Sequence, residues 1–457
     1  MLARMRRPIA VAALAAVAFA VPARANGRFP AASQLVAAPG DPSFLVLRTT
    51  YGLLFSSDAG VTWDWVCESA VGYGTNVEDP PVGITANKVV VAGMQEGLGV
   101  TTNKGCDWHF VGGELASQPI VDVVVRPDAP HTVLVLASKQ TGTSDAGDPL
   151  FTSQIFQSND DGANWSKLGA PLDPTYILET IEVAANDPHR LYASGVKGSG
   201  VTTSAMMFVS TNDGATWQPR AVPFDAANDR APFVSGVDPT SADRVYVRTS
   251  GTSTNNLFVS ENAGQSFQKI LTAPLLAGFA LSSDGATIFA GGPSFGLSVG
   301  TRSGYAFAHK SDVAVQCLAR VGTKLFACSD EKLTPDPFKF ILGESDDDGA
   351  TFAPRLRMNG LRGPLACAGD AGESVCVALW PALKNTLGIQ DDAGVDGGVH
   401  PLPDGGAPND GGPNPNNATS TSSCGCGATP ADAGGALGLV GLVAALMLMA
   451  RRSQNKQ

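Results

Sequence analysis

Residues 56–63 read SSDAGVTW, and the chain returns to this octapeptide along most of its length. The close copies are SNDDGANW (158–165), STNDGATW (210–217), SENAGQSF (260–267) and SDDDGATF (345–352). Two weaker copies, TTNKGCDW (101–108) and GTRSGYAF (300–307), keep the glycine and the final aromatic residue. The glycines lie at positions 60, 105, 162, 214, 264, 304 and 349, at intervals of 40 to 57 residues. A period of this length predicts seven copies of one supersecondary unit.

Each repeat is predicted to contain four short strands. The first unit supplies the apolar segments SQLVAA, SFLVLRT, GLLFSS and TWDWVC, and the second supplies PVGIT, KVVVAG, GLGVTT and DWHFVG in the same order. Four antiparallel strands in such a repeat are typical of a propeller blade. We therefore expect an all-β, seven-bladed β-propeller of four-stranded antiparallel blades over residues 26–388. The octapeptide falls at the turn between the third and fourth strands of each blade.

The octapeptide has the chemistry of a tight turn. Its third residue is Asp or Asn in most copies, and this side chain can accept hydrogen bonds from nearby backbone N–H groups. The glycine permits a positive φ angle, and the final aromatic residue can pack beneath the turn at the start of the fourth strand.

These octapeptides resemble the Asp-box (BNR) motif, S-x-D-x-G-x-T-W, of sialidases, xyloglucan-degrading glycosidases, sortilin-type receptors and photosystem assembly proteins. The resemblance covers residues 33–388 and implies a propeller with Asp-box turns. In that family the boxes lie away from the active sites, so the resemblance implies a structural role for the box residues. These residues are Asp58, Gly60, Trp63, Asn103, Gly105, Trp108, Asp160, Gly162, Trp165, Asn212, Gly214, Trp217, Asn262, Gly264, Phe267, Asp347, Gly349 and Phe352.

The cysteines predict disulfides, because the chain carries an export signal and exported proteins favour them. Cys317 and Cys328 flank LARVGTKLFA, and a two-residue loop at Gly322-Thr323 would place them directly opposite each other. Cys367 and Cys376 are predicted to pair in the same way around Ala371-Gly372, and by elimination Cys67 would pair with Cys106. Free buried thiols are the alternative. The segments GPLACAGD and ESVCVALW around these cysteines are predicted to be two more strands, which either complete the ring or begin an eighth blade.

Both ends of the chain indicate export. Residues 1–25 read as a signal peptide: arginines 4, 6 and 7 precede an apolar run, and Ala23-Arg24-Ala25 predicts cleavage after Ala25. Residues 389–423 are dominated by Asp, Gly, Pro and Asn, a composition typical of a disordered linker.

The C-terminal segment 424–457 predicts an anchor. Cys424-Gly425-Cys426 precedes an apolar run, which we expect to form a transmembrane helix over residues 434–450, and Arg451-Arg452 follows it on the cytoplasmic side. This ending resembles the MYXO-CTERM sorting tail of myxobacterial surface proteins. The resemblance implies processing near a cysteine, either Cys424 or Cys426, and attachment at the cell surface.

Composition and motifs argue against several activities. The net charge is −11, which argues against a nucleic-acid partner, because phosphate binding requires a basic face. Histidines 109, 131, 189, 309 and 400 are scattered, and His131 and His189 occupy equivalent interstrand turns, which indicates repeat geometry rather than a metal site. The acidic cluster GESDDDG (343–349) coincides with the seventh octapeptide and is read as a turn. We predict no metal site and no cofactor.

Two stretches are similar in part to motifs of glycosidases that carry the Asp-box. Arg28-Phe29-Pro30 is similar to the Arg-Ile-Pro motif of sialidases, but Gly27 precedes it and Phe29 replaces the isoleucine, so we read it as the entry to the first strand. Xyloglucanase-type enzymes place a catalytic aspartate in an Arg-Thr-Asp stretch of the first blade. This chain has Arg48-Thr49-Thr50 there, and threonine cannot act as a carboxylate base. We predict no catalytic residue.

We therefore expect an exported, surface-anchored, monomeric propeller that binds an extracellular glycan, peptide or protein without turning it over. The alternatives are a divergent Asp-box glycoside hydrolase, sialidase-like or xyloglucanase-like, and a scaffold for surface assembly. An acidic pair lining the central channel would favour hydrolysis, and an aromatic platform there would favour carbohydrate binding.

Overall fold

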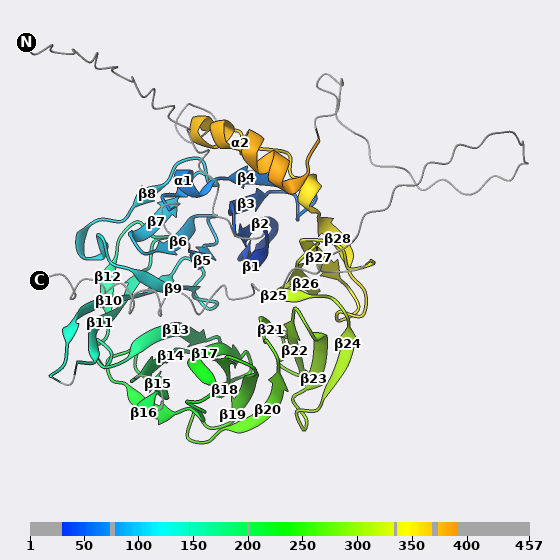
Figure 1. Cartoon of the computed structure of the whole chain (residues 1–457). Coiled ribbons are helices and arrows are strands. Elements are labelled where there is room, and N and C mark those ends of the chain that lie inside the picture. Colours follow the sequence, from blue (N-terminus) through cyan, green and yellow to red (C-terminus); the bar gives the residue numbers. More distant parts are fainter. Residues whose placement is uncertain are drawn as a thin grey trace, which may run out of the picture. The chain divides into compact units, whose positions relative to one another are not determined.

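The computed structural model describes residues 30–73, 78–145, 147–198, 202–332, 336–367 and 373–390. These residues form seven four-stranded antiparallel sheets arranged in a ring, which is a seven-bladed β-propeller (Figure 1). The predicted fold class is confirmed. The predicted signal peptide, Arg28, Phe29, His400, the linker after Gln390 and the tail with Cys424, Cys426 and residues 434–450 lie outside the described residues.

Every blade is built from four strands that follow one another in the chain. Blades 1 to 3 are β1 (Ala32–Ala38), β2 (Asp41–Thr49), β3 (Gly52–Ser56) and β4 (Asp64–Val66); β5 (Val82–Ile84), β6 (Val90–Met94), β7 (Gly97–Thr101) and β8 (His109–Phe110); and β9 (Ile120–Val125), β10 (Val133–Thr143), β11 (Pro149–Ser158) and β12 (Ser166–Leu168). Blades 4 and 5 are β13 (Ile177–Ala184), β14 (Asp187–Lys197), β15 (Ser204–Ser210) and β16 (Gln218–Ala221); and β17 (Asp229–Asp238), β18 (Ser241–Gly251), β19 (Asn255–Ser260) and β20 (Gln268–Ala273). Blades 6 and 7 are β21 (Gly278–Leu281), β22 (Thr287–Gly292), β23 (Gly296–Thr301) and β24 (Phe307–Ser311); and β25 (Val315–Val321), β26 (Lys324–Ser329), β27 (Leu342–Ser345) and β28 (Ala353–Leu356).

The hydrophobic core is divided into seven clusters, one between each pair of neighbouring blades. Phe44 and Phe55 of blade 1, for example, pack with Val90 and Met94 of blade 2. Both faces of each sheet are therefore buried, which explains why second and third strands such as β3 and β6 are buried along their whole length. Burial at these seams is the main force that holds neighbouring blades together.

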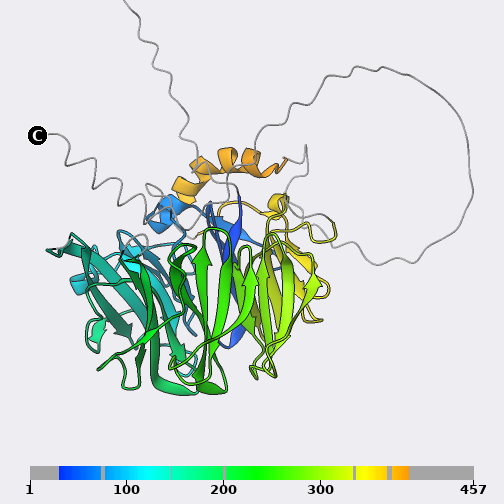
Figure 2. The same cartoon turned by 60° about the horizontal axis from the view of Figure 1, so that its bottom comes forward.

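Helix α1 (Glu68–Val71) follows β4, and helix α2 (Glu373–Leu387) lies beside blade 1, outside β4 (Figure 1). Both helices are at the top of the view in Figure 2. Two short 3-10 helices complete the described elements: η1 (Gly113–Leu115) and η3 (Met358–Gly360). None of the described helices is long and apolar enough to cross a membrane.

The chain after blade 7 differs from the sequence prediction. Residues 363–370 were expected to be a strand, but their described part makes a single parallel bridge between Pro364 and Trp65. The segment ESVCVALW was also expected to be a strand, and it is the first half of α2. The buried residues of α2, Cys376, Leu383 and Leu387, recur at helical spacing, whereas the short apolar run VCVALW by itself fits either a strand or a helix. No eighth blade forms among the residues described here.

The disulfide prediction was correct for one pair and wrong for two. Cys317 and Cys328 lie directly opposite each other on β25 and β26 and form a disulfide. Cys67 is bonded to Cys376, and Cys106 to Cys367. The predicted pairs Cys367–Cys376 and Cys67–Cys106 are therefore wrong, because α2 replaces the expected hairpin and lies beside blade 1 instead.

Candidate functional site

The octapeptide turns share one hydrogen-bond network. In six of them the side-chain oxygen of the third residue accepts the backbone N–H of the seventh residue at 2.8–2.9 Å; the acceptors are Asp58, Asn103, Asp160, Asn212, Asn262 and Asp347. In the same turns the hydroxyl of the first residue accepts the glycine N–H at 2.7–3.1 Å. The glycines have positive φ angles, as the tight turn requires. All these bonds are local, so they stabilise the turn itself.

The sixth turn lacks this network. Gly300 and Arg302 occupy its first and third positions, so neither supplies a hydroxyl or a carboxylate. Its positive φ angles fall on Gly304 and Tyr305, the fifth and sixth residues, whereas the other turns use the fourth and fifth. The Arg302 side chain donates to the Asp284 carbonyl and to the Thr240 hydroxyl of the neighbouring blade.

The histidines and acidic residues near these turns are also engaged locally. His131 and His189 contact the fourth residue of their own blade's octapeptide, Asp161 and Asp213, at 3.0 and 2.6 Å. Their equivalent positions confirm that the two histidines follow the repeat geometry. Within the described residues, no group of three or more His, Cys, Asp or Glu side chains is arranged to hold a metal ion.

In the stretch that resembles the Arg-Thr-Asp motif of xyloglucanases, Arg48 and Thr49 make hydrogen bonds within the protein. Arg48 donates from its guanidinium to Ser33 Oγ and to the carbonyl of Asp79, at 3.0 and 3.1 Å. The Thr49 hydroxyl is buried and donates to the Gly52 carbonyl at 2.8 Å.

Three carboxylates on the innermost strands of blades 3 and 4 were not predicted from the sequence. We call them the axial carboxylates: Asp122 on β9, and Glu179 and Glu182 on β13. These strands surround the centre of the ring in Figure 1. All three residues are partly buried. The sequence does contain a signal for these residues, because each carboxylate interrupts a mainly apolar strand: IVDVVV for β9 and ILETIEVA for β13.

Burial is the main cause of the raised pKa values of the axial carboxylates. It raises the pKa of Glu179 and of Glu182 to about 8, and the neighbouring charge of Asp122 adds to the effect on Glu182. Burial also raises the pKa of Asp122 to about 7, against two backbone N–H bonds, from Val123 and Ile181, that favour its ionised form. Protonated carboxyl groups near pH 7 can donate a hydrogen bond or a proton.

Asp122 also has a structural task. Its bond to the Ile181 N–H, at 2.9 Å, joins blade 3 to blade 4. Gln34 accepts the Val82 N–H in the same way between blades 1 and 2, and Thr180 accepts the Val234 N–H between blades 4 and 5. The position of Asp122 is therefore explained by the seam between blades.

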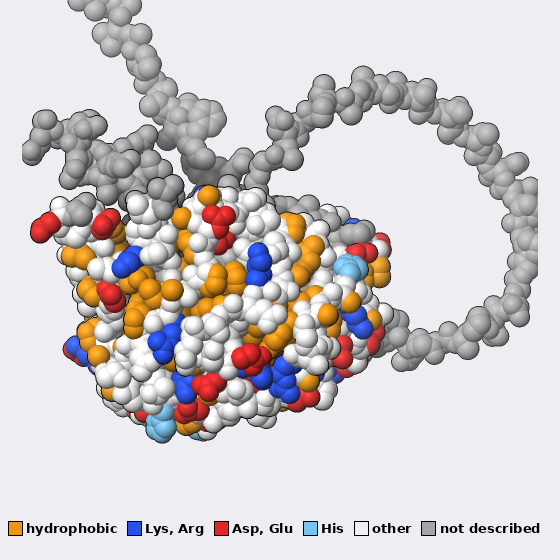
Figure 3. All heavy atoms as spheres, turned by 90° about the horizontal axis from the view of Figure 1, so that it is seen from below, with side chains coloured by type: hydrophobic (Ala, Val, Ile, Leu, Met, Phe, Trp, Pro, Cys, Tyr) orange, Lys and Arg blue, Asp and Glu red, His pale blue; other side chains and the backbone are white. Residues whose placement is uncertain are grey.

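A second feature is a groove of about 410 Å³ on the outer edge of blade 4, which we call the blade-4 groove. Its lining is mainly apolar and aromatic: Ala170, Pro171, Leu172, Asp173, Tyr176, Met206, Phe208, Trp217 and Pro219. Tyr176 and Phe208 in this lining pack edge to face, with ring centroids 5.1 Å apart. Figure 3 shows the side of the ring that includes blades 4 to 6, where apolar side chains are exposed between scattered charges of both signs.

Trp217 is held differently from the other octapeptide tryptophans. The indole N–H of Trp63, Trp108 and Trp165 donates to the carbonyl of its own turn's glycine at 2.9–3.1 Å. Trp217 donates instead to the Ala170 carbonyl, 3.3 Å away in the connection from blade 3. The same connection is fixed by a bond from the Ala170 N–H to the Gly214 carbonyl at 2.8 Å. Segment 170–173 therefore forms one wall of the groove and Trp217 the other.

Comparison with known proteins gives one family match. Residues 153–290 match the family model "Sortilin, neurotensin receptor 3", a stretch that includes the whole of the blade-4 groove. No curated protein matches the chain.

Several solved structures resemble the chain. An ancestral GH74 enzyme is 14% identical over 70% of this chain and 44% of its own, with a TM-score of 0.47. The GH74 xyloglucanase from Xanthomonas campestris is 14% identical over 74% and 65%, with a TM-score of 0.35. A puromycin-hydrolyzing peptidase of Mycobacterium tuberculosis is 14% identical over 74% and 55%, with a TM-score of 0.48. The chain thus spans less than two thirds of the length of each of these proteins.

Proposed function

We propose that this chain is an exported, surface-anchored β-propeller that binds an extracellular glycan, peptide or protein through the blade-4 groove without turning it over. The observation that carries the proposal is the groove itself, which joins aromatic side chains to a few polar groups on a rigid blade. Its volume of about 410 Å³ lies within the range of small-molecule sites. The three disulfides agree with an oxidising, extracellular setting.

The chemistry of the groove favours a flat, partly apolar ligand group. Trp217 is half-buried, so part of its indole surface is available for stacking against a sugar ring or an aromatic side chain. Asp173 is exposed at the rim and can accept hydrogen bonds from hydroxyl or amide groups. Connections held by a rigid scaffold are the usual place for binding residues in such folds.

Binding can be tested with the full chain on arrays of bacterial polysaccharides, sialosides and peptides. Trp217→Ala is expected to lower the affinity for a retained ligand by about tenfold or more, since a stacked aromatic anchor contributes more than 1 kcal/mol. Trp165→Ala is the matched control, because Trp165 ends the octapeptide of blade 3 and lies outside the groove. Equal affinity of both variants for every retained ligand would reject the groove as the binding site.

A second candidate is a divergent glycoside hydrolase, and the axial carboxylates are the observation that favours it. Two carboxyl groups with separated roles are needed for glycoside hydrolysis, and one must be protonated at working pH. The raised pKa values of Glu182 and Asp122 fit this requirement. If the chain releases sugar from a panel of polysaccharides and Glu182→Gln abolishes the release, the chain is a glycoside hydrolase. If no sugar is released, the proposal of a non-catalytic binding protein stands.

Anchoring is tested by fractionating the native host. We expect to find the propeller in the surface fraction. We also expect that replacing both Cys424 and Cys426 by Ala changes the processing of the chain and releases the propeller from the surface. An unchanged distribution of that variant would contradict a role for these cysteines.

A further inference from the structure

The first and last blades of this ring share no strand. Each of the seven sheets consists of strands that are consecutive in the chain, so β1 to β4 form blade 1 alone and β25 to β28 form blade 7 alone. Among the described residues, no strand of blade 7 is therefore hydrogen-bonded to a strand of blade 1. Blade 1 and blade 7 meet through side-chain packing, in which Leu45 and Leu47 contact the cluster that contains Phe326 and Ile341.

The chain beyond blade 7 covers this junction. We call its described residues, 361–367 and 373–389, the C-terminal strap. Its first part runs along the outer strand of blade 1: Arg362 N–H donates to the Trp63 carbonyl, Trp65 N–H to the Gly363 carbonyl, and Leu365 N–H to the Trp65 carbonyl, at 2.7–3.1 Å. Its second part, α2, adds Leu383 and Leu387 to the hydrophobic cluster between blades 7 and 1.

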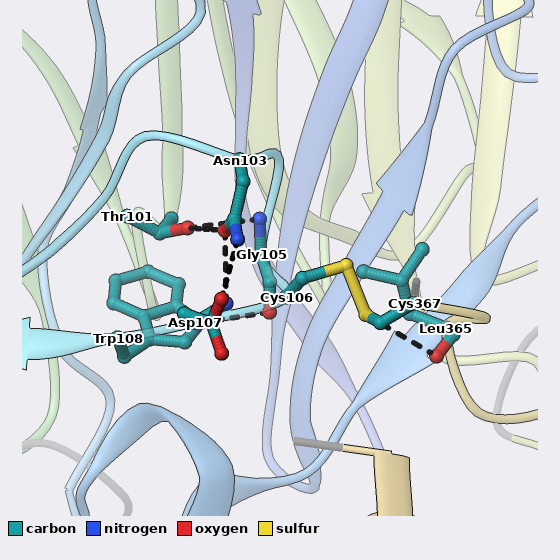
Figure 4. Close-up of a disulfide and its surroundings, with 8 residues drawn as sticks. All are labelled: Thr101, Asn103, Gly105, Cys106, Asp107, Trp108, Leu365 and Cys367. Atoms are coloured by element: carbon teal, nitrogen blue, oxygen red, sulfur yellow. Dashed lines mark hydrogen bonds between the residues drawn. A yellow bond between two sulfur atoms is a disulfide. The ribbon is translucent and has the colours of Figure 1, made fainter. Parts of the chain in front are cut away.

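Two disulfides fix the strap to the beginning of the ring. Cys67, directly after β4 of blade 1, is bonded to Cys376 of α2, and the two residues are 309 positions apart. Cys106, in the octapeptide turn of blade 2, is bonded to Cys367, 261 positions away, as Figure 4 shows. The third disulfide differs, because Cys317 and Cys328 are 11 positions apart in one hairpin of blade 7.

We infer that the two long-range disulfides close the ring and that their reduction opens it between blade 7 and blade 1, so that closure of the propeller is redox-sensitive. In this step each disulfide accepts two electrons and two protons from a dithiol. The S–S bond breaks, two thiols form, and the dithiol becomes a cyclic disulfide. The Cys106–Cys367 bond also reaches blade 2. The seams among blades 2 to 7 contain no long-range disulfide within the described residues, so they stay closed.

Burial sets the order of reduction. Cys67 and Cys376 are 1% and 3% exposed, and Cys317 and Cys328 are also buried, whereas Cys106 and Cys367 are half-buried. Thiolate attack needs access to a sulfur atom, so the Cys106–Cys367 bond is expected to break first. The buried Cys67–Cys376 bond then follows as the strap loosens.

The test measures hydrogen exchange by mass spectrometry on the full chain, before and after treatment with dithiothreitol, with alkylation to identify each free cysteine. Reduction of both long-range bonds is expected to raise exchange in β1, β25 and α2 by about tenfold or more and to leave β13 to β20 unchanged. The variant with all four of these cysteines replaced by Ser is expected to show the same pattern without reductant. The control is Cys317→Ser with Cys328→Ser, which should exchange as the native chain does in β1 and α2.

Three outcomes would overturn the inference: unchanged exchange in β1 and α2 after both long-range bonds are reduced, an equal rise in all seven blades, or the same opening in the hairpin control. If the four-serine variant does not fold, the reductant experiment on the folded native chain still decides, because it begins from the closed ring.

Discussion

At the scale of single residues, the octapeptide works as a set of interchangeable acceptors. Both Asp and Asn occupy the third position, and both accept the N–H of the seventh residue at 2.8–2.9 Å. The turn therefore requires one side-chain oxygen at the third position, and this oxygen does not have to carry a negative charge. The bonds nevertheless lower the pKa of the aspartates, because they favour the ionised form.

Asp347 tests this reading. The backbone and side-chain bonds from Thr351 lower its pKa to about 2. Asp347→Asn should therefore keep the stability of the native chain at pH 7, as Asn212 does in blade 4, whereas Asp347→Ala should cost about 1 kcal/mol. Since the folded pKa lies below the unfolded value, the native chain loses the contribution of this group as the pH falls from about 4 to 2, and the Asn variant does not. Urea unfolding at pH 7 and pH 3 measures both effects; equal losses for Asn and Ala would contradict it.

Glu182 should show the opposite dependence on pH. Its pKa is raised to about 8 by burial and by Asp122, so the folded state holds its proton more tightly than the unfolded state. The free energy of unfolding should then decrease as the pH rises from about 4.5 to 8. Glu182→Gln removes the ionisation, and we expect it to stabilise the chain by about 1–2 kcal/mol at pH 8 and to change little at pH 5. Glu114→Gln, an exposed carboxylate with a surface ion pair to Lys167, is the control; a gain of similar size there would contradict the assignment.

At the scale of elements, the connection from blade 3 to blade 4 shapes the blade-4 groove. Gly169 has a φ of 65°, and a Cβ at this position would lie 2.2 Å from the Gly214 carbonyl carbon. Gly113 has the same φ, but no atom lies within 4 Å of its Cβ position. Gly113→Ala should therefore cost about 1 kcal/mol for its backbone conformation alone.

Gly169→Ala is expected to cost about 2–3 kcal/mol or more, because it adds a clash with backbone to the same conformational penalty. It should also separate segment 170–173 from Trp217 and weaken any ligand bound in the groove. Thermal unfolding and the array measurement on both variants provide the test. If the two glycine variants lose equal stability and keep equal affinity, the connection does not position the groove.

The same scale shows what a sequence can predict. The strands of blades 1 and 2 were predicted correctly, because period-two apolar patterns and turn residues are local signals. Helix α2 was not, since VCVALW satisfies both a short strand and one face of a helix, and the choice depends on its packing against blade 1. The predicted pairs Cys367–Cys376 and Cys67–Cys106 were wrong for the same reason, because the position of Cys376 depends on helix α2. The blade-4 groove also could not be predicted, since its walls come from segments 170–173 and 206–219 and are joined by the contact of Trp217 with Ala170.

At the scale of the whole molecule, the strap joins the segment that follows blade 7 to blades 1 and 2 at the beginning of the ring. Under the chain-entropy account, a cross-link over 309 residues stabilises by about 5–6 kcal/mol and one over 11 residues by about 3 kcal/mol. The second long-range bond adds less than the first, because the first has already brought its partners close together. The strap also contributes without covalent bonds, through Leu361, Leu383 and Leu387 in the cluster between blades 7 and 1.

Truncation separates these two contributions. In a background with Ser at Cys67, Cys106, Cys367 and Cys376, a chain that ends at Gln390 keeps the packing of the strap, and a chain that ends at Gly360 lacks it. Each buried leucine side chain contributes about 1.5–3 kcal/mol, so we expect the shorter chain to unfold at a temperature about 5–10 °C lower. The native-cysteine chain that ends at Gln390 should unfold at the temperature of the full chain, since residues up to 390 form one compact unit. If the two serine-background chains unfold at the same temperature, packing by the strap contributes nothing measurable, and closure of the ring depends on the disulfides alone.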